Sequence, residues 1–85
     1  MSYLIKPIAT EIVAPTSSGT ATDVSNAQYV RIVNTAATTA HLVTFAGSFA
    51  GTMTIAGGDT VLIQKSKEDT IFAANAAVKL AKVSI

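Results

Sequence analysis

The sequence contains no cysteine and only one histidine, His41. Disulfide bonds and thiolate metal sites are therefore excluded, and one imidazole cannot form a histidine metal cluster. A chain of 85 residues makes one domain, and a domain of this size buries only about 60–65% of the surface that its unfolded chain exposes. Small domains usually gain stability from disulfides, a metal or a partner subunit. Of these supports, the composition leaves the partner subunit.

Charged residues are also scarce. Asp, Glu, Lys and Arg make up 13% of the sequence, against about 25% in an average soluble domain. The net charge of +1 is too small, and the basic residues are too scattered, for the positive surface that nucleic acids require. We therefore expect no nucleic-acid partner. A surface with so few charges suits contact with other protein, so the composition predicts a homo-oligomer or a docked subunit.

Long apolar runs are absent as well. No run reaches the roughly 18 residues that span a membrane. The N-terminal segment does not have the continuous apolar region of a signal peptide, because Lys6, Pro7 and Glu11 interrupt it. We expect neither a membrane partner nor a signal peptide.

β-branched side chains are abundant instead. Val, Ile and Thr supply 28 of the 85 residues, and their restricted χ1 angles favour strands. Residues 28–34 alternate regularly, with Val30 and Ile32 on the face opposite Tyr29. Residues 40–45 also alternate, with His41, Val43 and Phe45 on one face and Leu42 and Thr44 on the other. Both segments are predicted to be strands.

The turn residues divide the rest of the chain. Ala56-Gly-Gly-Asp59 has the glycines that a two-residue hairpin needs, which predicts pairing between the strands on either side of it. Gly51 indicates a bulge in the first of these strands. A helix over residues 73–81 is the alternative to the last strand, since alanine is the best helix former. Strands are predicted over residues 20–24, 49–55, 60–64, 70–74 and 78–85.

Seven or eight short strands joined by turns are typical of an all-β domain. The sequence predicts one antiparallel β-sandwich or jelly-roll-like domain, with an extended N-terminal arm over residues 1–8 and the sandwich over residues 9–85.

The N-terminal arm is the candidate surface for protein contacts. Pro7 removes a backbone donor and confines residues 4–13 to a sheet edge or a bend. An extended apolar arm cannot satisfy its own backbone groups, and pairing with the sheet edge of another subunit would satisfy them. The alternative is that the arm folds back on its own sheet. The candidate interface residues are Ser2, Tyr3, Leu4, Ile5 and Ile8.

No catalytic residue is predicted. His41 is the only side chain that titrates near neutrality without perturbation, and its position in a strand indicates a partly exposed or hydrogen-bonded sheet residue. No nucleophile, base and acid occur together in a recognisable pattern. We expect the protein not to be an enzyme and to bind no cofactor.

The acidic residues do not form a metal motif either. Glu68 and Asp69 are adjacent, and with Asp59 they have the carboxylates that a calcium ion prefers, but the spaced acidic loop of a calcium site is missing. We therefore expect no metal site. Residues 65–69 are predicted to be a solvated loop in which Lys65 and Lys67 balance the acids.

Two segments carry a resemblance to a known group of proteins. They are Tyr-Val-Arg-Ile-Val-Asn-Thr-Ala-Ala over residues 29–37 and Asp-Thr-Ile-Phe-Ala-Ala-Asn-Ala-Ala-Val over residues 69–78, separated by the Gly-Gly turn and the Ile-Gln-Lys strand end. From about Ile12 onward the chain resembles short Ala/Thr-rich virion structural proteins of tailed bacteriophages, notably those of marine bacteria and cyanobacteria.

The resemblance implies a location in the virion, which is assembled in the host cytoplasm. It implies a capsid decoration or cement protein that binds the major capsid protein or other virion proteins in many copies. A tail, neck or fibre component of the virion is one alternative. A carbohydrate- or receptor-binding β module, which would use Tyr29 or residues 45–49, is another.

Overall fold

Eight short strands make up most of the regular structure of the chain, whose residues 4–84 are described by the computed structural model. Within that range, one 3-10 turn, η1 (Ser18–Thr20), lies between the second and third strands. The strands in chain order are β1 (Lys6–Pro7), β2 (Ile12–Val13), β3 (Tyr29–Asn34), β4 (His41–Ala46), β5 (Gly51–Ile55), β6 (Thr60–Gln64), β7 (Thr70–Ala73) and β8 (Val78–Ser84).

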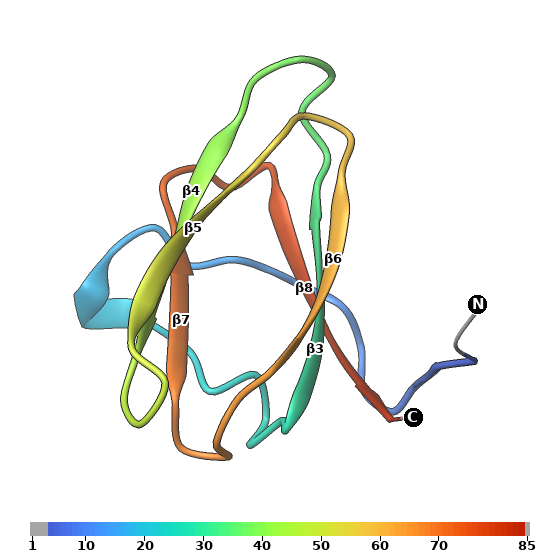
Figure 1. Ribbon diagram of the computed structural model, residues 1–85, viewed down its shortest axis with the longest axis vertical. Helices are drawn as coiled ribbons and strands as arrows, with labels where there is room; N and C mark the ends of the chain where they lie inside the picture. The colour runs from blue at the N-terminus through green and yellow to red at the C-terminus, as the bar shows by residue number, and fades with distance from the viewer. Residues whose placement is uncertain (1–3, 85) are drawn as a thin grey trace.

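The strands form two antiparallel sheets that pack face to face (Figure 1). The first sheet has the order β1-β8-β3-β6, and β2 also pairs with β8, on the edge that β1 occupies. The second sheet has the order β5-β4-β7. The predicted all-β sandwich is thereby confirmed.

The strand order is that of a jelly roll. An isolated bridge between Thr22 and Ile71 places one more extended segment beside β7. For comparison with a jelly roll, β1 and β2 together are counted as the first strand and the extended segment at Thr22 as the second. β3 to β8 then keep their numbers. The two sheets then have the orders 1-8-3-6 and 2-7-4-5, and this double Greek key is the jelly-roll arrangement.

The core lies between the sheets and consists of small and β-branched side chains. Val30 and Ile32 of β3 and Val43 of β4 point inward and are fully buried. Each such side chain contributes about 1.5–3 kcal/mol through burial. The alternation of residues 28–34 and 40–45 therefore predicted two strands and grouped Val30 with Ile32 on one face, which the structure shows to be the buried face. The apolar core cluster is Ala14, Val24, Ala27, Val30, Ile32, Val43, Ile55, Ile71, Ala73, Val78 and Leu80.

The predicted hairpin around residues 56–59 is wrong, although the turn itself is present. β5 pairs with β4, and β6 pairs with β3, so this turn carries the chain from one sheet to the other. Gly58 has a φ of +80°, and its N–H donates to the carbonyl of Asn34 at 2.9 Å. Glycines mark a reversal of the chain, but the core decides which strand each flanking segment joins.

Three smaller expectations also need correction. The predicted strand over residues 20–24 is reduced to the single bridge at Thr22, because η1 ends just before it. The pairing of β4 with β5 continues through Gly51 without a bulge. The helix considered over residues 73–81 is replaced by a turn and β8, whose Val78 and Leu80 bury one face against the core.

Candidate functional site

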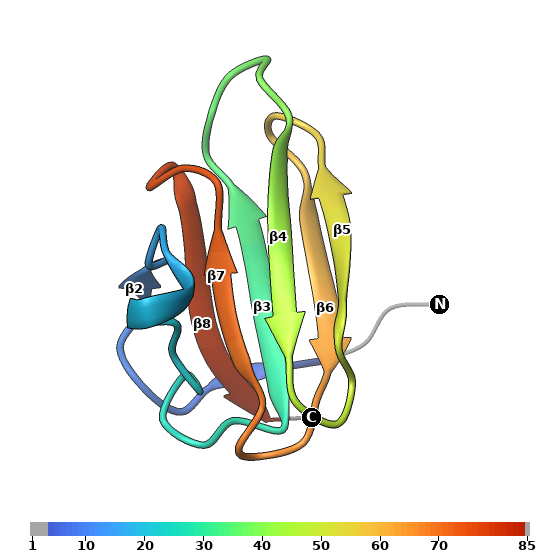
Figure 2. The same ribbon diagram turned by 90° about the vertical axis from the view of Figure 1, so that its left-hand side faces the viewer.

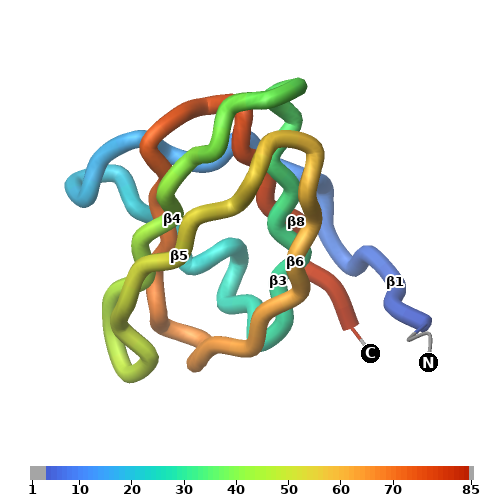
Figure 3. The backbone as a smooth tube through the Cα atoms, turned by 45° about the horizontal axis from the view of Figure 1, so that its top comes forward, coloured from blue at the N-terminus to red at the C-terminus, as the bar shows by residue number. Residues whose placement is uncertain are grey.

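The N-terminal arm lies against the sheet of its own chain over the part that the structure describes. β1 pairs with the end of β8, and the N–H of Ile8 donates to a carbonyl of β8 at 3.1 Å (Figure 3). Leu4 is 90% exposed and Ile8 is 51% exposed, while Ile5 is half-buried. Of the candidate interface residues, Ser2 and Tyr3 lie outside the described residues.

The sheet edge formed by β1 and β2 is protected against pairing with other chains. Its strands have two residues each, and Lys6, Pro7 and Glu11 lie in or between them. Glu11 is held above the sheet by an ion pair with Arg31, with 3.8 Å between Oε2 and Nη1. Short strands, proline and charge are the features by which natural proteins block an edge.

The opposite edge has none of these features. β5 and β6 are the outer strands of the two sheets, they lie on the same side of the sandwich (Figure 2), and neither has a further strand partner among residues 4–84. Between residues 46 and 64 the only charged side chain is Asp59, in the connecting turn. We call β5 and β6 the open edge. Large exposed apolar side chains on it or beside it are Leu42, Phe49, Met53 and Leu62.

The open edge was missed by sequence reasoning, which assigned β5 and β6 to one hairpin. In such a hairpin, β5 and β6 would pair with each other through backbone hydrogen bonds, so each strand would have a partner on that side. The signal that indicates the open edge is the run of 19 residues, from residue 46 to residue 64, with one charge. Natural proteins place charged residues or proline in edge strands that stay unpaired in water, so a long run without them indicates an edge that pairs with another chain.

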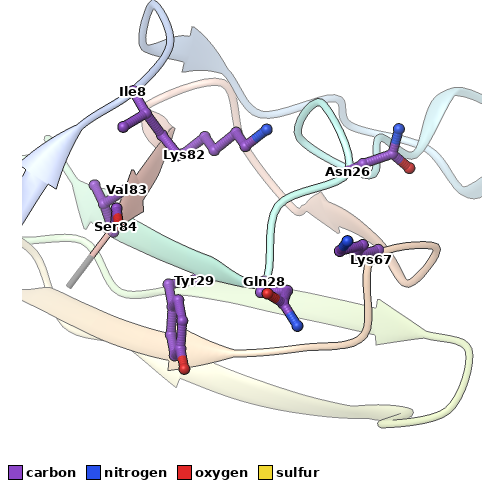
Figure 4. A pocket seen from close by; sticks show the side chains of 8 residues that line it. All are labelled: Ile8, Asn26, Gln28, Tyr29, Lys67, Lys82, Val83 and Ser84. Carbon is purple, nitrogen blue, oxygen red and sulfur yellow. The ribbon is translucent and has the colours of Figure 1, made fainter.

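A pocket of about 310 Å³ lies near the end of β8, where the arm, the start of β3 and the loop before β3 meet (Figure 4). Ile8 and Val83 give it apolar walls. The residue Tyr29, named as a candidate for ligand contact, also lines this pocket. The polar lining consists of Asn26, Gln28, Lys67, Lys82 and Ser84.

The loop that forms one wall of the pocket has an unusual backbone. Val24, Ser25 and Asn26 have φ angles of 54°, 57° and 58°, and left-handed residues without glycine cost about 1–2 kcal/mol each. Two hydrogen bonds close the turn: the Ala27 N–H donates to the Asp23 carbonyl, and the Asn26 N–H donates to Asp23 Oδ1, both at 3.2 Å. Burial of Val24 and Ala27 in the core offsets part of the strain.

Lys82 connects this turn to β8. Its register opposite Val30 places it on the inner face of the sheet, and its Nζ donates to the carbonyl of Ser25 at 2.8 Å. An ammonium group has three N–H donors, so this bond uses one of them. Lys67 extends into the pocket from the turn before β7. Among residues 4–84 neither Lys67 nor Lys82 forms an ion pair with a carboxylate.

The predicted solvated loop at residues 65–69 is wrong for Lys65 and Asp69, both of which are buried. Asp69 accepts hydrogen bonds from the N–H groups of Ser48 at 2.7 Å, Phe49 at 3.0 Å and Ser66 at 3.3 Å. Desolvation alone would raise the pKa of this carboxyl, but the three N–H donors and the charge of Lys65 outweigh it and hold the pKa below its usual value.

Lys65 is held by carbonyl groups instead of acids. Its Nζ donates to the carbonyls of Ser66 at 3.1 Å and Lys67 at 3.3 Å. Burial lowers the pKa of Lys65 and dominates over the opposing attraction of Asp23 and the other nearby carboxylates. The ionised carboxylate of Asp69 therefore stabilises the turn through backbone donors, whereas the two carbonyl partners of Lys65 offset only part of the cost of burying its charge.

The remaining candidate residues are dispersed. His41 is half-buried in β4, as a sheet residue, and Asp59 and Glu68 are exposed. Within residues 4–84 no three acidic or histidine side chains lie close enough together to hold a metal ion. The same residues include no helix with the length and hydropathy to cross a membrane.

Comparison with known proteins finds no matching family model, no similar curated protein and no similar solved structure. The features of the molecule that bear on function are therefore the jelly roll, the open edge and the pocket. A jelly roll by itself does not specify function, because capsid proteins, lectins and cupins all use it.

Proposed function

We propose that the protein is a structural component of a phage virion and acts as a capsid decoration protein. The observation that supports this proposal most directly is the open edge. It belongs to a small β domain with few charges, and the sequence resembles virion structural proteins of tailed phages.

The open edge has the chemistry of a docking surface. The outward N–H and C=O groups of β5 and β6 have no strand partner among the described residues, and a strand of a neighbouring protein would satisfy them. Met53 and Leu62 lie on these two strands and are 38% and 41% exposed. Their burial on docking adds apolar contact to the backbone hydrogen bonds.

The exposed part of the arm offers a second contact. Leu4 and Ile8 lie at the β1 edge, away from the open edge. A subunit that contacts its neighbours on two sides links them, and many copies on a shell add their contact energies. We infer that the partners are the major capsid protein and further copies of this chain, and that the apolar contacts stabilise the shell against internal pressure.

Particles that lack the protein test this proposal. They should rupture at a lower temperature than complete particles, and adding the purified chain should restore the rupture temperature. The copy number in complete particles should approach that of the major capsid protein. A copy number lower by an order of magnitude would favour the alternative, a tail, neck or fibre component, and an unchanged rupture temperature would contradict decoration.

Variants of the open edge test the surface itself. Met53→Lys and Leu62→Lys introduce a charge at the edge, so the chain should remain folded but no longer sediment with particles. Thr16→Lys is the matched control, because Thr16 is exposed in the loop after β2. Sedimentation of all three variants with particles, at wild-type levels, would exclude the open edge as the docking surface.

A carbohydrate-binding module is the second candidate function, and one observation favours it. Tyr29, whose ring offers an apolar face to a sugar, lines the pocket together with amide and ammonium groups. The two functions are compatible in one virion protein, since the pocket and the open edge involve different residues.

A further inference from the structure

We propose that the pocket beside Lys67 and Lys82 binds a single acidic sugar residue, with the sugar carboxylate between the two ammonium groups. This site deepens the carbohydrate-binding candidate. It does not depend on attachment to a capsid, because the open edge takes no part in it.

The charge of the pocket indicates an anionic ligand. Lys67 and Lys82 both line it, and neither forms an ion pair among the described residues. Glu68 is adjacent to Lys67 in sequence, but no ion pair among residues 4–84 includes it. Asp23 is three residues before Asn26, and its Oδ1 accepts the N–H of Asn26. Two ammonium groups without a carboxylate partner attract a carboxylate, and a partly enclosed site strengthens that attraction.

The remaining lining matches the hydroxyl groups and the apolar face of a sugar. Asn26, Gln28 and Ser84 provide amide and hydroxyl groups that both donate and accept hydrogen bonds. Ile8, whose N–H donates to the carbonyl of Lys82, provides an apolar contact for the ring face. The volume of about 310 Å³ is at the lower limit of ligand pockets, which is about 300 Å³, so the pocket is suited to one sugar residue.

The site is fixed before any ligand arrives. The left-handed turn places Asn26 at the wall of the pocket and directs the carbonyl of Ser25 at Lys82 Nζ. Figure 4 shows Lys82 extending from β8 toward the loop that holds Asn26. A side chain that is already ordered loses less entropy on binding. Strained backbone of this kind is concentrated at functional sites in proteins, and here its position coincides with the pocket.

Titration of the full-length, ¹⁵N-labelled chain tests the site without any phage particle. Galacturonate is the probe, galactose is the neutral control, and acetate is the control for the carboxylate alone. We expect galacturonate to shift the amide resonances of Asn26, Gln28 and Ser84, and to bind at least about tenfold more tightly than galactose, because only galacturonate engages the lysines. Acetate is expected to bind more weakly than galacturonate because it lacks the hydroxyl groups.

Three lysine variants separate a specific site from general attraction to a positive surface. Lys67→Gln and Lys82→Gln should each weaken galacturonate binding at least about fivefold. Lys79→Gln, on the outer face of the same strand as Lys82, is the matched control and should bind as the wild type does. Equal weakening by all three variants would overturn the proposal. So would equal affinity for acetate and galacturonate, or resonance shifts confined to residues outside the pocket.

Discussion

The carboxylate of Asp69 occupies the space that a side chain on Gly47 would need. A Cβ atom at Gly47 would overlap Asp69 Oδ1, and Gly47 has a φ of +126°, which residues with a side chain rarely adopt. The same carboxylate accepts the N–H groups of Ser48 and Phe49. The turn between β4 and β5 and the turn before β7 are thus joined through one acidic side chain.

Gly47→Ala should therefore lower the free energy of unfolding by about 2–4 kcal/mol, from backbone strain and from displacement of the Asp69 carboxylate. Chemical denaturation at pH 7 measures this change. Gly51→Ala is the matched control, because no atom lies within 4 Å of its added Cβ, and its effect should be under about 1 kcal/mol. Equal effects of the two substitutions would contradict the close fit at Gly47.

Asp69→Asn should make stability less dependent on pH in acid. The pKa of Asp69 in the folded chain lies below its ordinary value of 3.8, so its ionised form stabilises the fold above that pH. This stabilisation is lost as the pH falls through the folded pKa. The denaturation midpoint of the variant should be lower than that of the wild type at pH 7, and the two should converge below pH 3.8.

Glu68→Gln is the control for this experiment, since Glu68 is the adjacent acidic residue and is exposed. It should change the denaturation midpoint little at any pH. A constant difference between Asp69→Asn and wild type from pH 7 to pH 2 would show that the charge of Asp69 is not the source of its contribution.

Asn34→Ala should be among the most destabilising single substitutions. Asn34 is fully buried, and its Nδ2 donates to the carbonyls of Thr39 at 2.9 Å and Ile55 at 2.8 Å. Loss of the amide leaves these carbonyls without that donor, at a cost of about 2–4 kcal/mol in total. Asn75→Ala removes an exposed side-chain acceptor and should cost under about 1 kcal/mol. Thermal denaturation of both variants measures these losses of stability. Equal melting temperatures of Asn34→Ala and Asn75→Ala would contradict the predicted role of the buried amide.

Lys65→Met should remove the gain in stability that the wild type shows as the pH rises from neutral into the alkaline range. Burial holds the pKa of Lys65 in the folded chain below 10.5, so the charged form destabilises the fold at neutral pH. As the pH rises through the folded pKa toward 10.5, this penalty disappears in the wild type. The stability of the wild type relative to Lys65→Met should therefore increase toward pH 10.5. Lys67→Met is the matched control in the same turn, and a parallel change in both variants would refute the assignment to Lys65.

The strands β3 and β4 were predictable from sequence. In β3 and β4, inward and outward side chains alternate along the strand, and this alternation depends only on the local pleat. Val30, Ile32 and Val43 were placed correctly for that reason. The all-β class follows from the same residues, since a chain rich in valine, isoleucine and threonine favours strands throughout.

Strand partners were not predictable in the same way. The glycines at residues 57 and 58 indicate a turn, but whether it closes a hairpin or crosses the sandwich depends on which sheet can bury β6. The burial of Lys65 and Asp69 also depends on long-range packing, because the carboxylate partners Ser48 and Phe49 lie about twenty residues earlier in the chain.

The two surfaces differ in how far the sequence indicates them. The open edge leaves a trace, the long uncharged segment that contains Met53 and Leu62. The pocket leaves none, because Asn26, Lys67 and Lys82 come from three distant segments that only the topology brings together. The left-handed turn before β3 contains neither glycine nor proline. Its turn signal is the group Asp23, Ser25 and Asn26, which the sequence prediction did not use.

The crossing at residues 56–59 has a consequence for how the molecule is made. From Ile55 onward, each successive strand joins the sheet that the previous strand did not, in the order β5, β6, β7, β8. The first sheet combines β1 and β2 with β8, so it needs both ends of the described chain, and no half of the chain contains it complete. Assembly of the native state must wait for contacts between remote segments, which makes folding slow. A chain that lacks β8 contains all strands of the β5-β4-β7 sheet, but β3 has only β6 as a partner, so the first sheet forms only when β8 is available.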